Sequence, residues 1–182
     1  MKKIETGIPD LYAIEPRVFG DDRGYFFESF SDSWFRENIC NTHFVQDNES
    51  KSSRGVLRGL HFQKPPMAQA KLVRVVQGEV LDVAVDLRTD SKTYGHSFST
   101  LLSDENKRQL FVPRGFAHGF SVLSETAIFS YKVDNFYAPE TEGGILWNDP
   151  SLNIDWKLAN DEVKLSVKDE LLEKFENFQS PF

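Results

Sequence analysis

The chain has 182 residues, a formal net charge of −7, 13% aromatic residues and a single cysteine. A chain of this length buries about 70% of its unfolded surface as one domain, so we expect a single globular domain over residues 1–182. The net negative charge argues against a nucleic-acid partner. With Cys40 as the single cysteine, the chain has neither a disulfide framework nor a Cys-based zinc site. The lack of a long apolar run or leader-like segment predicts a cytoplasmic protein without a membrane partner.

The first thirty residues predict a short strand and an aromatic arm. Leu11–Ile14 is apolar, and residues 19–30 place a Gly-Asp-Asp turn before a Phe-rich run that Arg23 and Glu28 interrupt. This run is either an edge strand with a solvated ion pair or an arm that packs on a neighbouring chain and lends it both charges. Local sequence leaves both interpretations open.

A short helix and a polar strand are expected next. Residues 31–38 predict one helix with Ser31 or Asp32 as N-cap and its aromatic residues buried. Phe44–Glu49 predicts a strand with Gln46 and Asn48 on one side. These two amides are either a hydrogen-bonding pair for a polar ligand or the solvated face of an edge strand.

The strand predicted over Val56–Phe62 carries the most informative polar residues. In a regular strand Arg58 and His61 would point to opposite faces, and His61 would share its face with Gly59, which leaves open space beside the imidazole. Such a histidine is either a buried, hydrogen-bonded core residue or an acid/base that acts near neutral pH.

Residues 71–87 show the clearest strand pattern in the chain. Two β-branched runs flank Gln77-Gly78-Glu79, which predicts a hairpin-like turn. In the second run, apolar residues alternate with Asp82, Ala84 and Asp86. These carboxylates are either solvated or paired with cations inside a barrel.

The remainder predicts further strands and a helical end. Strands are expected at His96–Leu102, on both sides of a Pro-Arg-Gly turn within 110–123, at Ala127–Val133 and at Asn153–Trp156; residues 161–178 have helical spacing. Within Ala127–Val133, Tyr131 is by itself either a core tyrosine or a proton donor.

These elements predict an all-β fold. About ten short strands with turns every 8–12 residues, and a few short helices, mainly C-terminal, are typical of a jelly roll or another closed β-sandwich. The sequence contains no GxGxxG, P-loop or HExxH motif, and its four histidines include no close pair, so we expect no metal site.

Six segments together resemble one known family. They read EPRVFGDDRGYFFESF, QDNESKSSRGVLRGLHFQ, QAKLVRVVQGEVLDVAVDLR, LFVPRGFAHGF, YKVDNFYAPETEGGILWNDP and SVKD, and they run from about Ile8 to Asp169. In this order and spacing they resemble the dTDP-4-dehydrorhamnose 3,5-epimerase family. The resemblance implies a cupin-type jelly roll, a homodimer in which the arm over residues 1–30 packs on the partner, and a reaction without a cofactor.

The resemblance also implies the reacting groups. The substrate is a dTDP-linked 4-keto-6-deoxy sugar, and its ketone acidifies the C–H bonds at C3 and C5. The family pattern places the base at His61 with Asp169 as its partner, the proton donor at Tyr131, and a cation for the enolate oxygen at Lys71. The expected function is double epimerisation in dTDP-L-rhamnose biosynthesis.

A larger set of positions matches substrate-binding residues of the family. They are Arg23, Glu28, Gln46, Asp47, Asn48, Arg58, His118, Tyr137, Glu142 and Lys168. Arg58 and Arg23, the latter from the partner chain, match pyrophosphate contacts, and Tyr137 with Phe19 or Phe26 would sandwich the thymine. For Arg58 and His61 to reach one ligand, the strand must be irregular at Gly59.

Three alternatives stay open. A monofunctional 3- or 5-epimerase would have the same His, Lys and Tyr residues. A noncatalytic jelly roll that binds sugar nucleotides would need no base opposite an acid. A metal-dependent cupin oxygenase would need ligands that the sequence does not offer in the cupin pattern.

Overall fold

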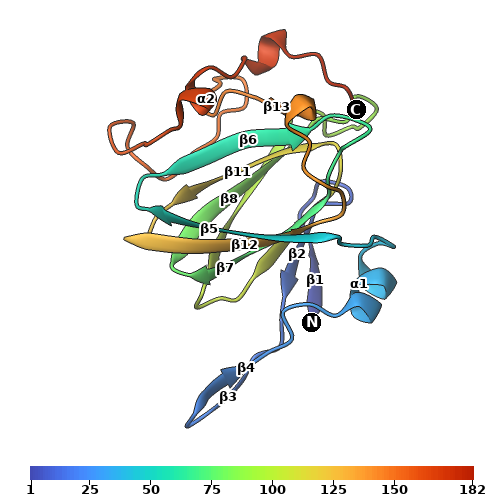
Figure 1. Cartoon of the computed structure of the whole chain (residues 1–182), viewed down its shortest axis with the longest axis vertical. Coiled ribbons are helices and arrows are strands. Elements are labelled where there is room, and N and C mark those ends of the chain that lie inside the picture. Colours follow the sequence, from blue (N-terminus) through green and yellow to red (C-terminus); the bar gives the residue numbers. More distant parts are fainter.

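The computed structural model describes residues 1–182 as two antiparallel sheets packed face to face (Figure 1). The six-stranded sheet has the order β1 (Lys2–Glu5), β2 (Tyr12–Glu15), β10 (Gln109–Val112), β7 (Lys71–Gln77), β12 (Thr126–Val133) and β5 (Gln46–Ser53). The five-stranded sheet has the order β13 (Glu142–Gly144), β6 (Leu57–Gln63), β11 (Phe116–Val122), β8 (Glu79–Asp86) and β9 (Ser97–Ser103). The predicted all-β jelly roll is confirmed.

The two sheets enclose an apolar core because their strands alternate side chains between two faces. Val73, Val75, Phe120 and Phe129 belong to this central cluster of 15 buried residues. The rings of Phe120 and Phe129 stack with centroids 4.2 Å apart, which joins the five-stranded sheet to the six-stranded sheet. The core fills only part of the space between the sheets, and polar residues line the rest.

The hairpin predicted around Gly78 is wrong. Strand β7 pairs with β10 and β12, whereas β8 pairs with β11 and β9, so the turn carries the chain from one sheet to the other. Gly78 has φ +81°, and a Cβ there would lie 2.1 Å from the carbonyl oxygen of Thr126. The sequence of a tight turn is the same in a hairpin and at a connection between two sheets. Pairing with strands that are distant in sequence determines which of the two forms.

The helical prediction for residues 161–178 is largely wrong. Only α2 (Val167–Glu170) and the 3₁₀ turn η2 (Phe175–Asn177) are helical, and Leu171 is 79% exposed. Leu165, Phe175 and Phe178 instead pack one by one on the outer face of the five-stranded sheet, whose own outward residues are apolar. Contacts with the sheet therefore replace the intrahelical packing that the spacing suggested.

The strand expected at Asn153–Trp156 is also absent. Asn153 adopts a positive φ of 45°, which interrupts extended backbone. Trp156 is buried, and its indole N–H donates to the carbonyl oxygen of Trp147 at 2.8 Å. The segment is held by side-chain packing in the same outer cluster rather than by strand pairing.

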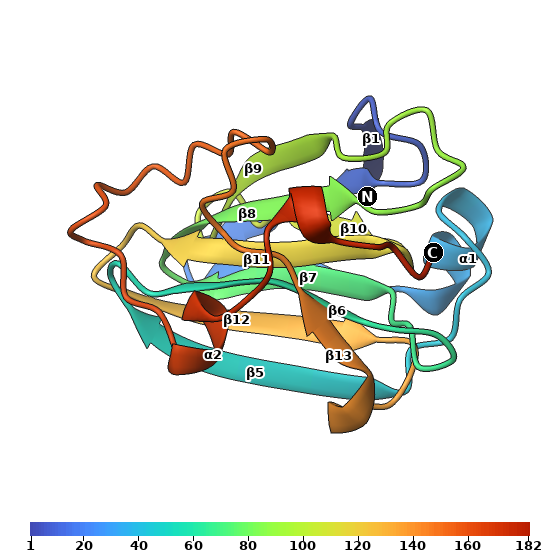
Figure 2. The same ribbon diagram turned by 90° about the horizontal axis from the view of Figure 1, so that it is seen from above.

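The N-terminal region has three parts. Strand β1, which was not expected, pairs with β2 along the edge of the six-stranded sheet. The helix α1 (Asp32–Asn38) agrees with the prediction and covers the outer face of that sheet with buried Phe35, although Ser31 makes no side-chain cap hydrogen bond and Trp34 is only partly buried. Between them, β3 (Phe19–Asp21) and β4 (Gly24–Phe26) form a hairpin that projects from the body (Figure 1). On the opposite side of the molecule, the C-terminal segment lies over the five-stranded sheet (Figure 2). None of the helices is long or apolar enough to cross a membrane.

Candidate active site

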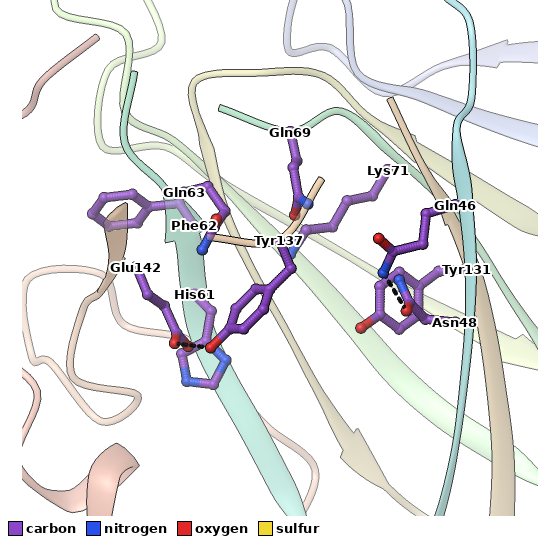
Figure 3. Close-up of a pocket in the computed structure, with 10 residues that line it drawn as sticks. All are labelled: Gln46, Asn48, His61, Phe62, Gln63, Gln69, Lys71, Tyr131, Tyr137 and Glu142. Carbon is purple, nitrogen blue, oxygen red and sulfur yellow. Dashed lines mark hydrogen bonds between the residues drawn. The ribbon is translucent and has the colours of Figure 1, made fainter. Parts of the chain in front are cut away.

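A cavity opens between the two sheets and has two connected parts. The outer part has a volume of about 350 Å³ and is lined by Gln46, Asn48, His61, Phe62, Gln63, Gln69, Lys71, Tyr131, Tyr137 and Glu142 (Figure 3). The inner part, of about 120 Å³, is lined by Ser50, Arg58, His61, Lys71, His118, Gly119, Phe120, Phe129 and Tyr131. Three residues, His61, Lys71 and Tyr131, belong to both parts and mark the centre of the cavity.

An irregularity in β6 brings Arg58 and His61 to the same side of the strand, as predicted. The pairing of β6 with β11 shifts register between His118 and Phe120, opposite Gly59. Gly59 has φ +130°, and a Cβ on it would lie 2.5 Å from the Cα of Gly119. Only glycine fits this close approach. The bulge that it allows turns the side chains of Arg58 and His61 into the cavity, while Leu57, Leu60 and Phe62 face outward.

His61 is held by a carboxylate that is distant in sequence. The Nε2 atom of His61 lies 2.5 Å from Oδ1 of Asp169, which is buried at the start of α2. Asp169 is oriented by its own backbone N–H, which donates to the Ser166 hydroxyl at 3.2 Å. Burial by itself would raise the pKa of Asp169, but the hydrogen bond from His61 and the imidazole's charge lower it below its usual value. An ionised Asp169 holds the proton on Nε2 and leaves Nδ1 as the basic atom.

Tyr131 approaches from the other sheet. It lies on β12 of the six-stranded sheet, whereas His61 lies on β6 of the five-stranded sheet. In Figure 3 the two rings lie on opposite sides of the cavity, and the Lys71 side chain reaches toward the space between them. Burial raises the pKa of the Tyr131 hydroxyl, although the charge of Arg58 opposes the rise. The phenol is therefore protonated at neutral pH and available as a proton donor.

Lys71 is the cation at the centre of the cavity. Burial lowers the pKa of its ammonium group to about 8, while the negative charges of Asp82 and Glu142 oppose that decrease. At pH 7 most Lys71 side chains still carry a charge. A positive charge in a desolvated cavity stabilises a negative oxygen far more strongly than it would in water.

A second histidine–aspartate pair lies beside the first. His118 on β11 is the register partner of His61 on β6, and its Nε2 atom is 3.0 Å from both carboxylate oxygens of Asp82. Asp82 is fully buried, which raises the pKa of its carboxyl group against the lowering effect of His118 and Lys71. The structure thus decides the question left open for this aspartate: it is paired inside the sandwich.

Three residues form a polar network at the mouth of the cavity. The Tyr137 hydroxyl donates to Oε2 of Glu142 at 2.9 Å, and Lys168 forms an ion pair with the same carboxylate. Burial would raise the pKa of Glu142, but the Lys168 and Tyr137 hydrogen bonds lower it overall. Tyr137 is 55% exposed, so its ring can meet a ligand that enters from solvent.

The remaining predicted positions divide between the cavity and elsewhere. Gln46 and Asn48 face inward from β5 and are joined by a 2.7 Å hydrogen bond. Asp47 points to the opposite side of the same strand, where Lys132 donates to it at 2.8 Å. Arg23 and Glu28 are exposed on and just after the projecting hairpin, outside this chain's cavity. One chain alone therefore brings together all but three of the predicted residues.

Sequence reasoning missed three polar residues that line the cavity: Ser50, Gln63 and Gln69. A usable signal existed for Gln63, which follows His61 by two positions on one strand and shares its face. No comparable local signal marks Gln69, because it lies in a loop. The structure brings together no group of three or more His, Cys, Asp or Glu side chains that could hold a metal ion.

Comparison with known proteins gives a consistent result. The model of the family described as dTDP-4-dehydrorhamnose 3,5-epimerase matches residues 5–177. The chain is 56% identical over 176 residues to the dTDP-4-dehydrorhamnose 3,5-epimerase of Shigella flexneri, and the match covers 96% of each protein.

Solved structures agree with the sequence matches. The crystal structure of the same enzyme from Elizabethkingia anophelis has a TM-score of 0.93 and 55% identity, with 97% of both chains covered. The dTDP-6-deoxy-D-glucose-3,5-epimerase of Legionella pneumophila, solved with dTDP-4-keto-L-rhamnose, has a TM-score of 0.94 and 48% identity over 98% of this chain and 94% of that one. With its fold, its cavity and these matches in agreement, the chain belongs to the dTDP-4-dehydrorhamnose 3,5-epimerase family.

Proposed function

We propose that this protein converts dTDP-4-dehydro-6-deoxy-D-glucose to dTDP-4-dehydro-L-rhamnose by inverting C3 and C5, without a cofactor, in dTDP-L-rhamnose biosynthesis. The observation that carries this function is the placement of His61 and Tyr131 on opposite walls of one cavity, with Lys71 at its centre. Inversion beside a ketone needs a base on one face of the carbon and a proton donor on the other.

Each inversion follows from these three side chains. Nδ1 of His61 removes the proton from the carbon beside the ketone, and the C–H electrons move to the ketone oxygen as an enolate. The Lys71 ammonium stabilises that negative oxygen, and Asp169 stabilises the imidazolium. The enolate carbon then takes a proton from the Tyr131 hydroxyl on the opposite face, which leaves a phenolate. Before the second carbon reacts, His61 loses its extra proton to solvent and the Tyr131 phenolate takes up a proton from solvent.

The nucleotide is held by cations and by a second chain. Arg58 lines the inner part of the cavity and Lys168 stands at its mouth, and both can neutralise a diphosphate. We infer a homodimer in which the projecting hairpin of one chain brings Arg23 and the nearby Glu28 to the cavity of its partner. Phe19 and Phe26 of this hairpin are 50% and 67% exposed, and such aromatic residues are costly to leave in water without a partner.

The cytoplasm is the expected site of the reaction. The chain has one cysteine and no disulfide, which fits a reducing compartment. Nucleotide sugars as substrates agree with that location.

Solvent isotope exchange tests the function directly. The purified protein is incubated with dTDP-4-dehydro-6-deoxy-D-glucose in D2O without added metal or nicotinamide, and the C3–H and C5–H signals are followed by NMR. Exchange at both carbons is expected, and in a separate reaction, to which a reductase and reduced nicotinamide are added, the dTDP-4-dehydro-L-rhamnose product should be trapped. Exchange at one carbon would indicate a monofunctional epimerase, and no exchange would leave only a sugar-nucleotide binder.

The Tyr131→Phe variant separates catalysis from binding in the same assay. It removes one hydroxyl and leaves the ring packing unchanged, so the variant should bind dTDP normally but lose turnover by roughly 10²-fold or more. Unchanged turnover would exclude Tyr131 as the proton donor.

A further inference from the structure

Two glutamines in the outer part of the cavity have no role in the proton transfers. Gln63 lies on β6 two residues after the base His61, and Gln69 lies in the segment that leads into β7, two residues before Lys71. Since a strand rises about 3.3 Å per residue, Gln63 is roughly 7 Å from the base along the same face. Both amides therefore adjoin the space in which the reacting sugar would lie.

The orientation of each amide is determined by backbone groups. The Gln63 Oε1 atom accepts a hydrogen bond from the backbone N–H of Ala138 at 2.9 Å and lies 3.1 Å from the Thr141 hydroxyl. The Gln69 Nε2 atom donates to the carbonyl oxygen of Asn135 at 2.8 Å. A backbone N–H can only donate and a carbonyl can only accept, so neither amide can be flipped without losing its partner.

The unused half of each amide faces the cavity. Nε2 of Gln63 and Oε1 of Gln69 make no hydrogen bond within the protein, although Gln63 is only 5% exposed (Figure 3). Both atoms are accessible from the cavity, so each is free to hydrogen-bond to a ligand there. The two glutamines offer one fixed donor and one fixed acceptor.

The chemistry of that pair selects among the groups of the substrate. A phosphate accepts hydrogen bonds but cannot donate to Oε1 of Gln69, and a ketone likewise only accepts. A hydroxyl both donates and accepts, so one hydroxyl satisfies both amides. The imide edge of thymine can do the same, but it is not the part of the substrate that must reach His61 and Lys71. The hydroxyls nearest to the base and the cation are those of the hexose.

We propose that Gln63 and Gln69 bind the hydroxyl groups of the hexose beside the reacting ketone and thereby select a hexosyl nucleotide over the free nucleotide. This inference rests on the proposed function and names the residues that recognise its sugar. The two amides act by binding, and the proton transfers stay with His61 and Tyr131.

The test compares the binding of dTDP with that of dTDP-glucose by calorimetry. Since dTDP-glucose has no ketone, its C–H bonds are not acidified and it does not react. The Gln63→Glu variant keeps an oxygen for the Ala138 N–H and loses the donor that faces the cavity. The Gln69→Lys variant keeps a donor for the Asn135 carbonyl and loses the acceptor. The ratio of the two dissociation constants measures what the hexose contributes in each protein.

The opposite charges of the two variants make the result specific. The added charges should change dTDP affinity in opposite directions, weaker for Gln63→Glu and stronger for Gln69→Lys. The preference for dTDP-glucose over dTDP should nevertheless fall in both, by roughly three- to tenfold for one lost hydrogen bond. Gln77→Glu, at an exposed glutamine outside the cavity, is the matched control and should leave the preference unchanged.

Every other outcome overturns the inference. An unchanged preference in both variants would show that the amides do not contact the hexose. If dTDP affinity fell equally in both variants with the preference unchanged, the amides would bind the thymine edge instead. Solvent exchange by the wild-type protein is measured in parallel, so failure of the proposed epimerisation is distinguished from failure of this assignment.

Discussion

At the scale of single residues, Lys71 links the activity to pH. Burial brings its pKa to about 8, and in the mechanism that we propose only the protonated form stabilises the enolate. We therefore expect kcat/KM to fall as pH rises through about 8, because the ammonium loses its proton there. A profile that stays flat to pH 10 would contradict an electrostatic role for Lys71.

The buried carboxylate of Asp82 should set the pH at which kcat/KM falls, which is the alkaline limb of the pH profile. Its negative charge raises the pKa of Lys71, so Asp82→Asn should move the limb to lower pH. Asp82 itself does not line the cavity. The pH profile of kcat/KM measures the shift. A loss of activity with an unmoved limb would mean that Asp82 only supports the position of His118.

At the scale of elements, the bulge in β6 depends on glycine. Gly59→Ala would force a Cβ to within 2.5 Å of the Gly119 Cα in addition to the strain of φ +130°. We expect a loss of roughly 3 kcal/mol or more in the free energy of unfolding, together with lost activity.

Gly7→Ala is the control for that variant. Gly7 also has a positive φ, +87°, but no atom lies within 4 Å of its hypothetical Cβ. The Gly7→Ala variant should lose only roughly 1 kcal/mol in the free energy of unfolding, from backbone strain alone. A denaturant titration measures this loss. Equal losses in the two variants would mean that the approach of β6 to β11 is not what requires Gly59.

The loop after β8 is held by one buried carboxylate. Asp86 accepts hydrogen bonds from Arg88, Ser91 and Thr93, which overcome the effect of burial and lower its pKa from 3.8 to about 2. Because the folded pKa is depressed, its stabilisation is complete above about pH 4 and is lost as pH falls through about 2.

The Asp86→Asn variant should therefore lose roughly 2 kcal/mol near neutral pH, and its stability should depend less on acid than that of the wild type between pH 4 and 2. Thermal or urea unfolding across that range measures the difference. Parallel acid profiles for both proteins would contradict this role of Asp86.

At the scale of the whole molecule, arm exchange can be tested by mixing two inactive variants. Arg23→Ala should impair the cavity of the partner chain, which the arm enters. His61→Ala should impair the cavity of the chain that carries the substitution. If the arm crosses to the partner, a mixed dimer contains one site with both native residues. Random mixing then restores about a quarter of the sites.

Activity after co-refolding the two variants is the measurement. No recovery, despite mixed dimers confirmed by mass spectrometry, would mean that the arm serves its own chain or contributes nothing to the site. Each variant refolded alone is the control.

Sequence reasoning succeeded where a short segment contains the decisive information. The conflict between Arg58 and His61 predicted the irregularity at Gly59, which the structure confirms. Sequence reasoning failed where contacts between distant segments determine the local structure. The turn at Gly78 joins two sheets because β10, β11 and β12 pair with its strands, and residues 161–178 lie across a sheet instead of forming a long helix.

The sequence by itself determined the fold class and the family, because strand periodicity and residue motifs are local patterns that a linear chain displays completely. Only the tertiary structure decided which polar residues meet. It joined His61 to Asp169 across 108 positions, buried Asp82 against His118, turned Asp47 away from the cavity and directed Gln63 and Gln69 into it. These outcomes depend on strand pairing and sheet packing between distant segments, and a side chain's direction is set there rather than by its neighbours in sequence.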